Sequence, residues 1–516
     1  MFHLRSSGGR HGRRTLAPAA LVLPAALAAS LVFWTGCNGS PQGEGGENGD
    51  GGTDQAAEYS LPEKSHIVLI TVDTLRADHM SAYGYARNTS PTLKRLADEG
   101  VRFDRAAVQW PKTGPSFASM MTSTHPSDNG IVRKVGIEVP CTFRMLAEIL
   151  KEQGYSTHAV VANGALAAEL GYNQGFDTYG QTWKQEVTEE GADPNDAAAV
   201  NRMVEPILET LDPEKPFFLW VHYLDPHFPY TPPAPYSDMF QDDEHFDESE
   251  VFEVSDRPMQ QLVKVGFKKV LEERTDLAFY KARYDAEIAY TDFHINALLE
   301  NMENRGLMNK TLTVMTSDHG ESLGEHYFYF DHGRFGFDTC LNVPLIFHYP
   351  GQLPPRVVNE PVALVDLAPT LLQIAGVELE DGRYMQGKTM MPRLFGQVEP
   401  ENVVFSEAGN EVEGKWQRIA QNERFKLIYA RSGKVQRFMA GKGEAFALYD
   451  IENDPGETQA VGAEYPEELE ALKKALWAHT RDDPFSPHVD TSATCAQFEG
   501  MNKETESQLK ALGYLQ

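Results

Sequence analysis

Two apolar runs that end in acidic residues constrain the fold more than any other feature of the sequence. Residues 66–72 (HIVLITV) end at Asp73, and residues 311–316 (TLTVMT) lead to Asp318 and His319. Apolar runs without polar alternation predict strands that are buried on both faces, as in a parallel sheet. Ligands bind such sheets at the carboxyl ends of the strands, so both acidic ends are predicted to lie at a site. An acid that only caps a loop is the alternative for Asp73.

Strand-like and helix-like segments alternate along most of the chain. Such alternation predicts an α/β domain with a mixed, largely parallel central sheet between helices. Further buried strands are expected at residues 157–162 and 217–221, and helices at residues 88–100 and 284–299. After residue 400 the pattern changes to a smaller α+β subdomain. Its expected strands are residues 403–406, 416–420, 425–429 and 446–449, and its expected helices are near residues 464–479 and 504–512.

Length and charge exclude some classes of function. A chain of 516 residues can bury the core of one large α/β domain or of two domains. Its formal net charge of -29 opposes binding to a polyanion, so we expect no nucleic-acid partner. The four cysteines are widely spaced, which is the pattern of neither a disulfide framework nor a zinc site.

The N-terminal residues have the pattern of a targeting sequence. Residues 1–14 carry arginines and no acid, residues 16–34 are apolar, and Cys37 follows a glycine. This order predicts an export signal, although an apolar run of that length also suits a membrane anchor. The segment before Cys37 resembles a bacterial lipoprotein cleavage site, which implies a lipid on Cys37 that holds the protein to a membrane of the cell envelope. The predicted divisions are a signal (1–37), a flexible Gly-rich acidic tether (38–60), a catalytic domain (61–400) and the C-terminal subdomain (401–516).

Residues 110–122 (WPKTGPSFASMMT) predict an anion site at the start of a helix. Pro115 suits the first helical position, which would place Thr113 and Gly114 just before the N–H-bearing end. A hydroxyl at that point faces the place where a phosphate or sulfate binds. The alternative is an ordinary capped helix.

Two further segments concentrate polar groups directly after strands. Residues 222–233 form a loop rich in proline and aromatic residues that contains Asp225 and His227. Residues 318–333 bring several acids together with His319, His326 and His332. An adjacent aspartate and histidine suit a divalent cation, and so many charges in one short segment are hard to explain as packing.

Together these motifs resemble the sulfatase family of the alkaline phosphatase superfamily over roughly residues 64–480. The matching segments are VDTLRADHMSAYGY, TGPSFASMMTSTHPSDNGI, WVHYLDPHFPY, TSDHGESLGEH and FDHG, with VDLAPTLLQIAGV, QGK and LYDIENDPGE after them. The resemblance implies an alkaline-phosphatase-like fold and one divalent metal ion: Ca, Mg, Mn or Zn. It matches Thr113 to the nucleophile, Asp73, Thr113, Asp318 and His319 to metal ligands, and His227 and His332 to histidines that hold ester oxygens or protonate the leaving group.

The chain departs from the family pattern at informative positions. Family sulfatases carry Cys or Ser where this chain has Thr113, and a dedicated enzyme converts that residue to formylglycine. Threonine cannot undergo this conversion. The arginine of the C/S-x-P-S-R motif is Phe117 here, the second acid of the paired aspartates is Thr74, and the GKWHLG lysine motif is missing. Secondary candidates for the site are Thr74, Lys134, Asp225 and His326.

The expected activity is hydrolysis of small or polymeric sulfate or phosphate esters through a covalent intermediate on Thr113. Water can cleave a phosphothreonine by attack at phosphorus, whereas a sulfothreonine lacks the exit that formylglycine provides, and this difference favours phosphoryl substrates. Two alternatives stay open. One is a phosphoglycerol or phosphoethanolamine transferase of the envelope, and the other is a non-catalytic lipoprotein that binds a sulfated or phosphorylated polymer.

Overall fold

The computed structural model describes residues 61–62, 64–132, 138–185, 193–241, 243–255, 264–266, 271–377, 385–397, 402–410, 415–430, 446–480 and 502–512. All the described residues lie in the second of two units of the chain, Glu58–Gln516. The predicted export signal, Cys37 and the tether lie outside the described residues, as does Lys134. Among the described helices, none is long and apolar enough to cross a membrane.

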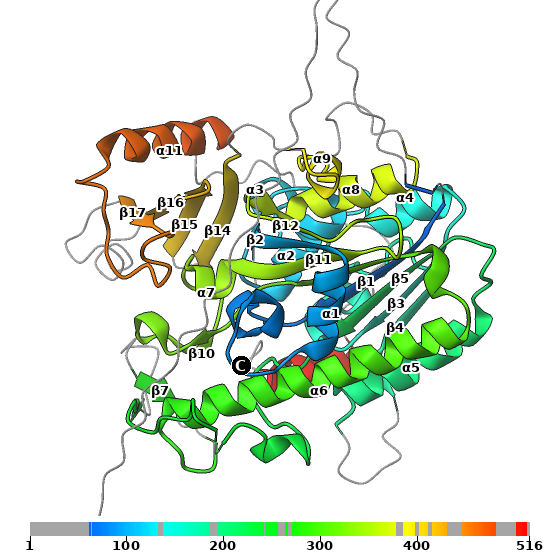
Figure 1. Cartoon of the computed structure of the whole chain (residues 1–516), viewed down its shortest axis with the longest axis horizontal. Helices are drawn as coiled ribbons and strands as arrows, with labels where there is room; N and C mark the ends of the chain where they lie inside the picture. Colours follow the sequence, from blue (N-terminus) through cyan, green and yellow to red (C-terminus); the bar gives the residue numbers. More distant parts are fainter. Residues whose placement is uncertain are drawn as a thin grey trace, which may run out of the picture. The chain divides into compact units, whose positions relative to one another are not determined.

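The described part of the second unit is built around a nine-stranded sheet (Figure 1). Its order is β12-β2-β11-β8-β1-β5-β3-β4, and β13 pairs with β2. The strands are β1 (His66–Val72), β2 (Val101–Ala107), β3 (Ser156–Val161), β4 (Thr178–Gln181), β5 (Phe217–Tyr223), β8 (Thr311–Ser317), β11 (Asn342–His348), β12 (Arg356–Val358) and β13 (Val362–Ala363). Only β11 runs antiparallel to its neighbours β2 and β8. The predicted mixed, mostly parallel sheet is therefore confirmed.

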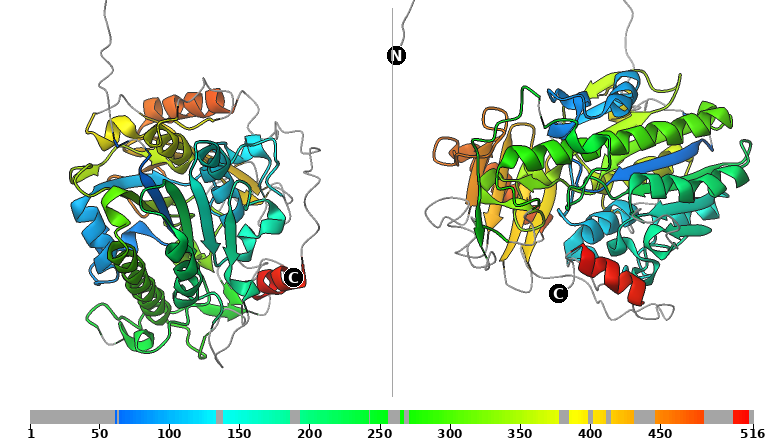
Figure 2. Two further views of the ribbon diagram at one scale, coloured as in Figure 1. Left: turned by 90° about the vertical axis from the view of Figure 1, so that its right-hand side faces the viewer. Right: turned by 90° about the horizontal axis from the view of Figure 1, so that it is seen from below.

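Helices cover both faces of this sheet (Figures 1 and 2). One apolar core joins α2, α4 and α8 to one face, and a second joins α1, α5 and α6 to the other. The helices are α1 (Pro91–Glu99), α2 (Thr113–Thr122), α3 (Pro126–Asn129), α4 (Leu146–Glu152), α5 (Ala197–Thr210), α6 (Leu277–Asn304), α7 (Asp338–Leu341), α8 (Leu367–Ile374) and α9 (Met391–Leu394). Burying apolar side chains on both faces explains why the central strands read as unbroken apolar runs.

A second, antiparallel sheet forms the predicted C-terminal subdomain. Its order is β14-β15-β16-β17, with strands β14 (Val404–Asn410), β15 (Lys415–Gln421), β16 (Phe425–Ala430) and β17 (Phe446–Asp450). Helix α11 (Pro466–His479) packs its Leu472 and Leu476 on this sheet, and α12 (Lys503–Ala511) is the last described helix. Two small sheets pair β9 (Ser322–Leu323) with β10 (Tyr329–Asp331), and β6 (Glu253–Ser255) with β7 (Lys264–Gly266).

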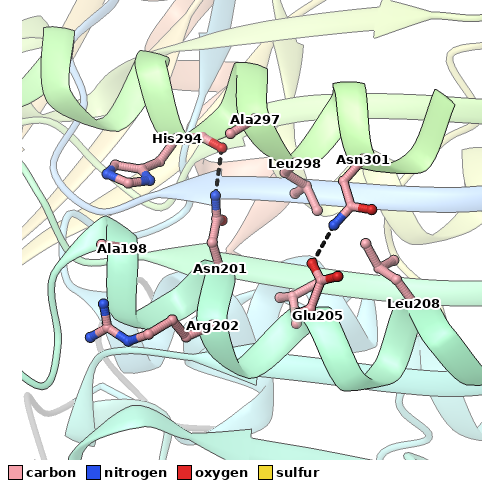
Figure 3. A pocket seen from close by; sticks show the side chains of 10 residues that line it. Ala198, Asn201, Arg202, Glu205, Leu208, His294, Ala297, Leu298 and Asn301 are labelled. Carbon is pink, nitrogen blue, oxygen red and sulfur yellow. Dashed lines mark hydrogen bonds between the residues drawn. The ribbon is translucent and has the colours of Figure 1, made fainter. Parts of the chain in front are cut away.

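Amide side chains join α5 and α6 on one face of the large sheet (Figure 3). The Asn201 Nδ2 donates to the carbonyl of His294 at 2.8 Å, and the Asn301 amide donates to Glu205. A cavity of about 470 Å³ lies between the two helices beside these bonds. The bonds hold two long helices together where their apolar contact is incomplete.

The start of α2 differs from the sequence prediction. The helix begins at Thr113, so Pro115 occupies its third position rather than its first. The first helical bond runs from the Ser116 N–H to the Lys112 carbonyl at 3.0 Å. Residues in the first turn need no N–H for the helix, so a proline in its third position removes no hydrogen bond. Thr113 therefore belongs to the first turn itself.

Candidate active site

Strand register brings the two predicted acidic ends together. Val72 pairs with Tyr223 of β5 on one side and with Ser317 of β8 on the other. The next residue, Asp73, donates its N–H to the Tyr223 carbonyl at 2.9 Å. Parallel neighbours end at the same edge of a sheet, so Asp73 and Asp318 emerge side by side. Both lie at the carboxyl edge, as predicted.

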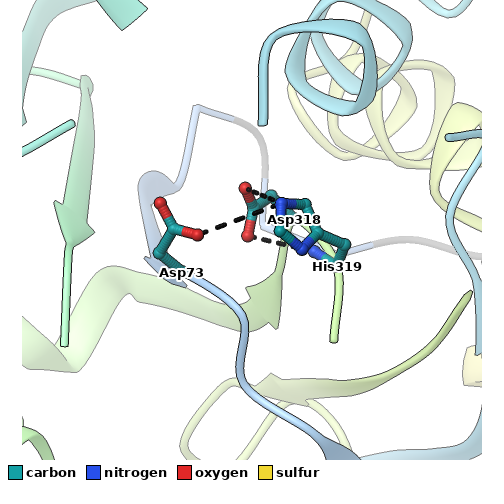
Figure 4. Close-up of side chains that lie close together, drawn as sticks. All are labelled: Asp73, Asp318 and His319. Carbon is teal, nitrogen blue, oxygen red and sulfur yellow. Dashed lines mark hydrogen bonds and ion pairs between the residues drawn. The ribbon is translucent and has the colours of Figure 1, made fainter. Parts of the chain in front are cut away.

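Asp73, Asp318 and His319 form a compact, fully buried cluster (Figure 4). Each offers one ligand atom, and these atoms lie within 4.8 Å of one another. The His319 Nε2 is 3.4 Å from Asp318 Oδ2 and 4.0 Å from Asp73 Oδ1. Those two carboxylate oxygens have no hydrogen-bond partner among the described residues. Buried carboxylates that face each other need a cation, and this donor set suits a divalent metal ion.

The two carboxyl groups of the cluster differ in their pKa. Burial and the nearby charge of Asp73 raise the pKa of Asp318 to about 6. Burial also opposes ionisation of Asp73, but interaction with the His222 imidazole and the charges of nearby histidines outweigh it and lower its pKa to about 2. Asp73 is therefore an anion at neutral pH, with one oxygen directed at the cluster.

The Thr113 hydroxyl lies at the edge of the cluster. Its Oγ1 is 3.4 Å from the His319 Nε2, and the side chain is almost fully buried. Thr113 is also the first residue of α2, where backbone N–H groups point out of the helix and the helix dipole favours negative charge. The arrangement places a hydroxyl between the three cluster residues and an anion-binding helix end.

Two predicted histidines lie next to one another beside the cluster. The His332 ring is 4.2 Å from the His319 ring and 5.4 Å from the His227 ring, centroid to centroid. The His332 Nδ1 is 3.0 Å from a Glu321 carboxylate oxygen, and the Tyr230 hydroxyl donates to the other oxygen at 3.1 Å. Because a carboxylate only accepts, it favours a proton on His332 Nδ1.

Thr74 has a strained backbone next to Asp73 of the cluster. Its φ is 55°, a region that β-branched residues rarely adopt. The conformation is held by the Thr74 N–H, which donates to Asp318 Oδ1 at 3.2 Å, and by the Tyr284 hydroxyl, which donates to the Thr74 carbonyl at 2.7 Å. The buried Thr74 Oγ1 has no hydrogen-bond partner within the described part of the chain. Strain of this kind is typical of functional sites.

Two of the secondary candidates face elsewhere. The Asp225 carboxylate accepts the N–H of Ala197 at 3.0 Å, at the start of α5, and burial raises its pKa to about 8. The His326 ring stacks on Phe337 at 3.7 Å between centroids. Proximity to His227 in sequence therefore did not put Asp225 into the site, because the turn after β5 directs its carboxylate toward the helix.

Two residues outside the predicted site set contact Asp73 directly. The Asn163 Nδ2 donates to Asp73 Oδ2 at 2.5 Å, and the His222 Nε2 lies 3.5 Å from the same oxygen. Asn163 follows the buried run at 157–162, so its place after a strand was a signal that sequence reasoning could have used. Phe117, at the position of the family arginine, lies 5.1 Å from the His222 ring and 5.0 Å from the Trp220 ring.

Lys112 connects the start of α2 to the C-terminal sheet. Its Nζ donates to the Gly409 carbonyl of β14 at 3.1 Å, and the Gly409 N–H donates to the Gly333 carbonyl at 2.9 Å. A Cβ on Gly333, next to His332, would lie 2.4 Å from the Lys112 Cε. Only glycine leaves room for this side chain, so the C-terminal sheet is packed directly against the site.

Comparison with known proteins identifies two family models. The model described as Sulfatase matches residues 65–377, and the model described as N-sulphoglucosamine sulphohydrolase, C-terminal, matches residues 324–482. The first match covers all the residues of the cluster as well as Thr113, His227 and His332. The second begins just after β9 and spans β10 and the C-terminal sheet.

Relatives match over most of their length. An arylsulfatase of Clostridium perfringens is 24% identical over 476 residues, which covers 80% of this chain and 94% of the relative. An N-acetylglucosamine-6-O-sulfatase of Bacteroides thetaiotaomicron is 24% identical over 509 residues, with 80% and 86% covered. A phosphonate monoester hydrolase of Agrobacterium radiobacter shares the fold with a TM-score of 0.65 at 23% identity, over 81% of this chain and 96% of that one.

Proposed function

The chain belongs to the sulfatase family, and on this premise we propose that it is a metal-dependent ester hydrolase whose nucleophile is Thr113. The observation that carries the proposal is the 3.4 Å distance from Thr113 Oγ1 to His319 Nε2, at the edge of the buried carboxylate–imidazole cluster. Family membership makes the protein a sulfatase-like ester hydrolase. The identity of the nucleophile rests on this geometry.

Asp73, Asp318 and His319 would hold the metal ion. The buried carboxylate oxygens that lack a hydrogen-bond partner among the described residues and the neighbouring imidazole fit such a group, and the Thr113 hydroxyl lies beside them. A bound divalent ion would lower the pKa of the Thr113 hydroxyl and neutralise charge on the ester oxygens. Its identity among Ca, Mg, Mn and Zn does not change the roles that follow for the protein groups.

The protein groups divide the reaction between them. After its proton passes to water, the Thr113 oxygen attacks the sulfur or phosphorus atom, and the bond from that atom to the leaving oxygen breaks. The N–H groups at the start of α2 and the His227 ring hold the non-bridging oxygens. His332, supported by Glu321, gives its proton to the leaving alkoxide. Water then attacks the same atom, His332 takes up one of its protons, and the Thr113 oxygen leaves and regains a proton from water.

Thr113 determines which esters can complete this cycle. A phosphoryl or phosphonyl group on threonine can be released by water at phosphorus, whereas a sulfothreonine has no hemiacetal through which to eliminate sulfate. Neighbours with this fold include a protein in complex with its substrate D-glucosamine-2-N,6-O-disulfate and a phosphonate monoester hydrolase. We therefore assign phosphoric or phosphonic esters as the substrates that turn over, with small and polymeric alcohols as leaving groups.

The protein is proposed to act outside the cytoplasm. The N-terminal residues up to Cys37 have the order of an export signal with a lipidated cysteine. Cys141 is disulfide-bonded, and such bonds persist in oxidising compartments. Radiolabelled palmitate should enter the wild-type protein and should not enter Cys37→Ser. Equal labelling of both would contradict a lipid on Cys37.

A turnover panel tests the proposal. The purified protein is assayed with an aryl sulfate, an aryl phosphate monoester, a phosphate diester and an aryl phosphonate, each with added Mn²⁺, Mg²⁺, Ca²⁺ or Zn²⁺. We expect phosphorus esters to turn over, Thr113→Ala to lose on the order of 10³-fold or more in kcat, and Thr113→Ser to retain activity. Turnover that survives in Thr113→Ala would refute the nucleophile. Sustained sulfate turnover by the wild type would refute the assignment to phosphorus esters.

A further inference from the structure

Three fully buried side chains lead from the interior of the sheet to Asp73. The Trp220 indole Nε1–H donates to the Thr71 hydroxyl at 2.9 Å, and that hydroxyl lies 3.1 Å from the His222 Nδ1. The other ring nitrogen, His222 Nε2, faces Asp73 Oδ2 at 3.5 Å. Register explains the contact, because Thr71 of β1 is the direct partner of His222 of β5.

The donor and acceptor properties of these groups fix the direction of the hydrogen bonds that link them. An indole nitrogen can only donate, so Thr71 accepts from Trp220 and has one hydrogen left to donate. The nearest acceptor is His222 Nδ1 at 3.1 Å, whereas the Val221 carbonyl is 3.5 Å away. A carboxylate can only accept, so a hydrogen on His222 Nε2 meets Asp73 favourably and a lone pair there would be repelled. Both ends therefore favour the ring form that carries its hydrogen on Nε2.

The two oxygens of the Asp73 carboxylate therefore differ, because side chains hold one of them and the other faces the cluster. Asn163 at 2.5 Å and His222 at 3.5 Å both approach Oδ2. Oδ1, which has no hydrogen-bond partner among the described residues, faces His319. Side-chain donors behind a metal ligand commonly fix its orientation in this way.

Phe117 completes the enclosure of His222. Its ring meets the His222 ring edge to face, at 5.1 Å and 81°. The motif of the family has a cation at this position, so the substitution replaces a charged donor with an apolar wall. Among the described residues, Asn163 donates a hydrogen bond to the Asp73 carboxylate, whereas the buried His222 Nε2, which has no hydrogen-bond partner there, faces the carboxylate at ion-pair distance.

We propose that the Trp220–Thr71–His222 chain is a positioning device that orients Asp73 for the metal ion, with Phe117 fixing the imidazole in place. The inference rests on the proposed function, since it concerns the metal ligand Asp73. It makes His222 a positioning residue rather than a catalytic one. It also explains why an aromatic residue is accommodated at the position of the family arginine.

The test measures metal affinity rather than turnover. Metal-free wild type and variants are titrated with Mn²⁺ by calorimetry. We expect His222→Ala to weaken binding about 10- to 100-fold, Thr71→Val to weaken it less, and His222→Gln, whose amide can donate from a similar position, to restore most of the loss. His158→Ala is the matched control, because the His158 Nδ1 also contacts a threonine hydroxyl, that of Thr178 at 2.8 Å, in a sheet contact away from Asp73.

A second measurement does not depend on any substitution. Histidine-selective ¹⁵N labelling of the metal-free wild type reports which ring nitrogen of His222 carries the hydrogen, and we expect Nε2, with assignment by loss of the signal in His222→Gln. A hydrogen on Nδ1 alone would overturn the proposed direction. Equal Mn²⁺ affinity in wild type and His222→Ala would overturn the positioning role while leaving the metal site intact. Absence of Mn²⁺ binding by the wild type would overturn the metal site as well.

Discussion

The molecule contains two groups of buried charges that are organised in opposite ways. In the C-terminal sheet, the fully buried Lys426 Nζ lies 2.6 Å from Asp338 and 2.8 Å from Glu457. At the carboxyl edge of the large sheet, Asp73 and Asp318 face each other with a histidine between them, and two of their oxygens have no hydrogen-bond partner in the described part of the chain. The first group contains its own cation, and the second does not.

This difference separates a structural ion pair from a functional site. A buried carboxylate is unfavourable unless a positive charge lies next to it. The C-terminal sheet satisfies that requirement with a lysine, so its buried charges neutralise one another. The cluster at Asp73 leaves that requirement unmet, and the Thr113 hydroxyl and two histidines lie beside it. Variants in the two groups should therefore affect different properties of the protein.

The largest expected effect is on turnover at the open site. Replacing the proton donor in His332→Asn should lower kcat by about 10²- to 10⁴-fold for esters with poor leaving groups and far less for nitrophenyl esters. The melting temperature should change little. The matched control is His348→Asn, because His348 also contacts a glutamate, Glu99 at 3.5 Å, and lies outside the site. An equal loss for both leaving-group classes would contradict the role of His332 as acid.

The second-largest expected effect is on the stability of the fold, through the buried ion pair of Lys426. Lys426→Met leaves two carboxyl groups without their buried cation and should lower the free energy of unfolding by about 3–5 kcal/mol. The kcat of the folded fraction should be unchanged. Urea unfolding measures the first quantity, with Lys94→Met as the control, because Lys94 pairs with Asp98 at the exposed surface, where such pairs contribute less than about 1 kcal/mol. A stability loss no larger than that of the control would remove the contrast.

Asp318→Asn is expected to raise the stability of the metal-free protein, by less than Lys426→Met lowers it. Burial and Asp73 raise the pKa of Asp318 to about 6, above its value in the unfolded chain, so its ionisation destabilises the metal-free fold as pH rises from about 4 through 6. Asparagine cannot ionise, and the metal-free variant should be more stable than the wild type at pH 8 by on the order of 1 kcal/mol. Melting curves between pH 5 and pH 8 with a chelator measure this. A variant less stable than the wild type throughout would show that the two carboxylates do not repel.

Much of the fold was accessible from the sequence because its central strands are buried on both faces. The apolar runs before Asp73 and Asp318 predicted β1 and β8, and their acidic ends predicted the edge at which the site lies. The antiparallel β11 and its neighbour β2 were not predicted. β2 shows why, since partly exposed residues interrupt its buried ones and no continuous apolar run is left to detect.

The composition of the site was harder to predict, because its supporting contacts are made across strands. Asn163 and His222 reach Asp73 from β3 and β5, at sequence separations of 90 and about 150 residues. Asp225 shows the converse error, since it lies two residues from His227 and yet its carboxylate is directed at the start of α5. Sequence spacing identifies residues that can do chemistry, whereas register and turn geometry decide which of them meet.

The count of divalent ions bound to the metal-free protein after dialysis against Mn²⁺, Mg²⁺, Ca²⁺ or Zn²⁺ tests the central claim most directly. The account predicts one tightly bound ion for each wild-type chain, none at the same concentration in Asp73→Asn, and a stabilisation of about 2.7 kcal/mol when the free ion is at 100 times its Kd. A wild-type chain that binds no ion, or an Asp73→Asn chain that binds as well as the wild type, would show that the open cluster is not the metal site that serves Thr113.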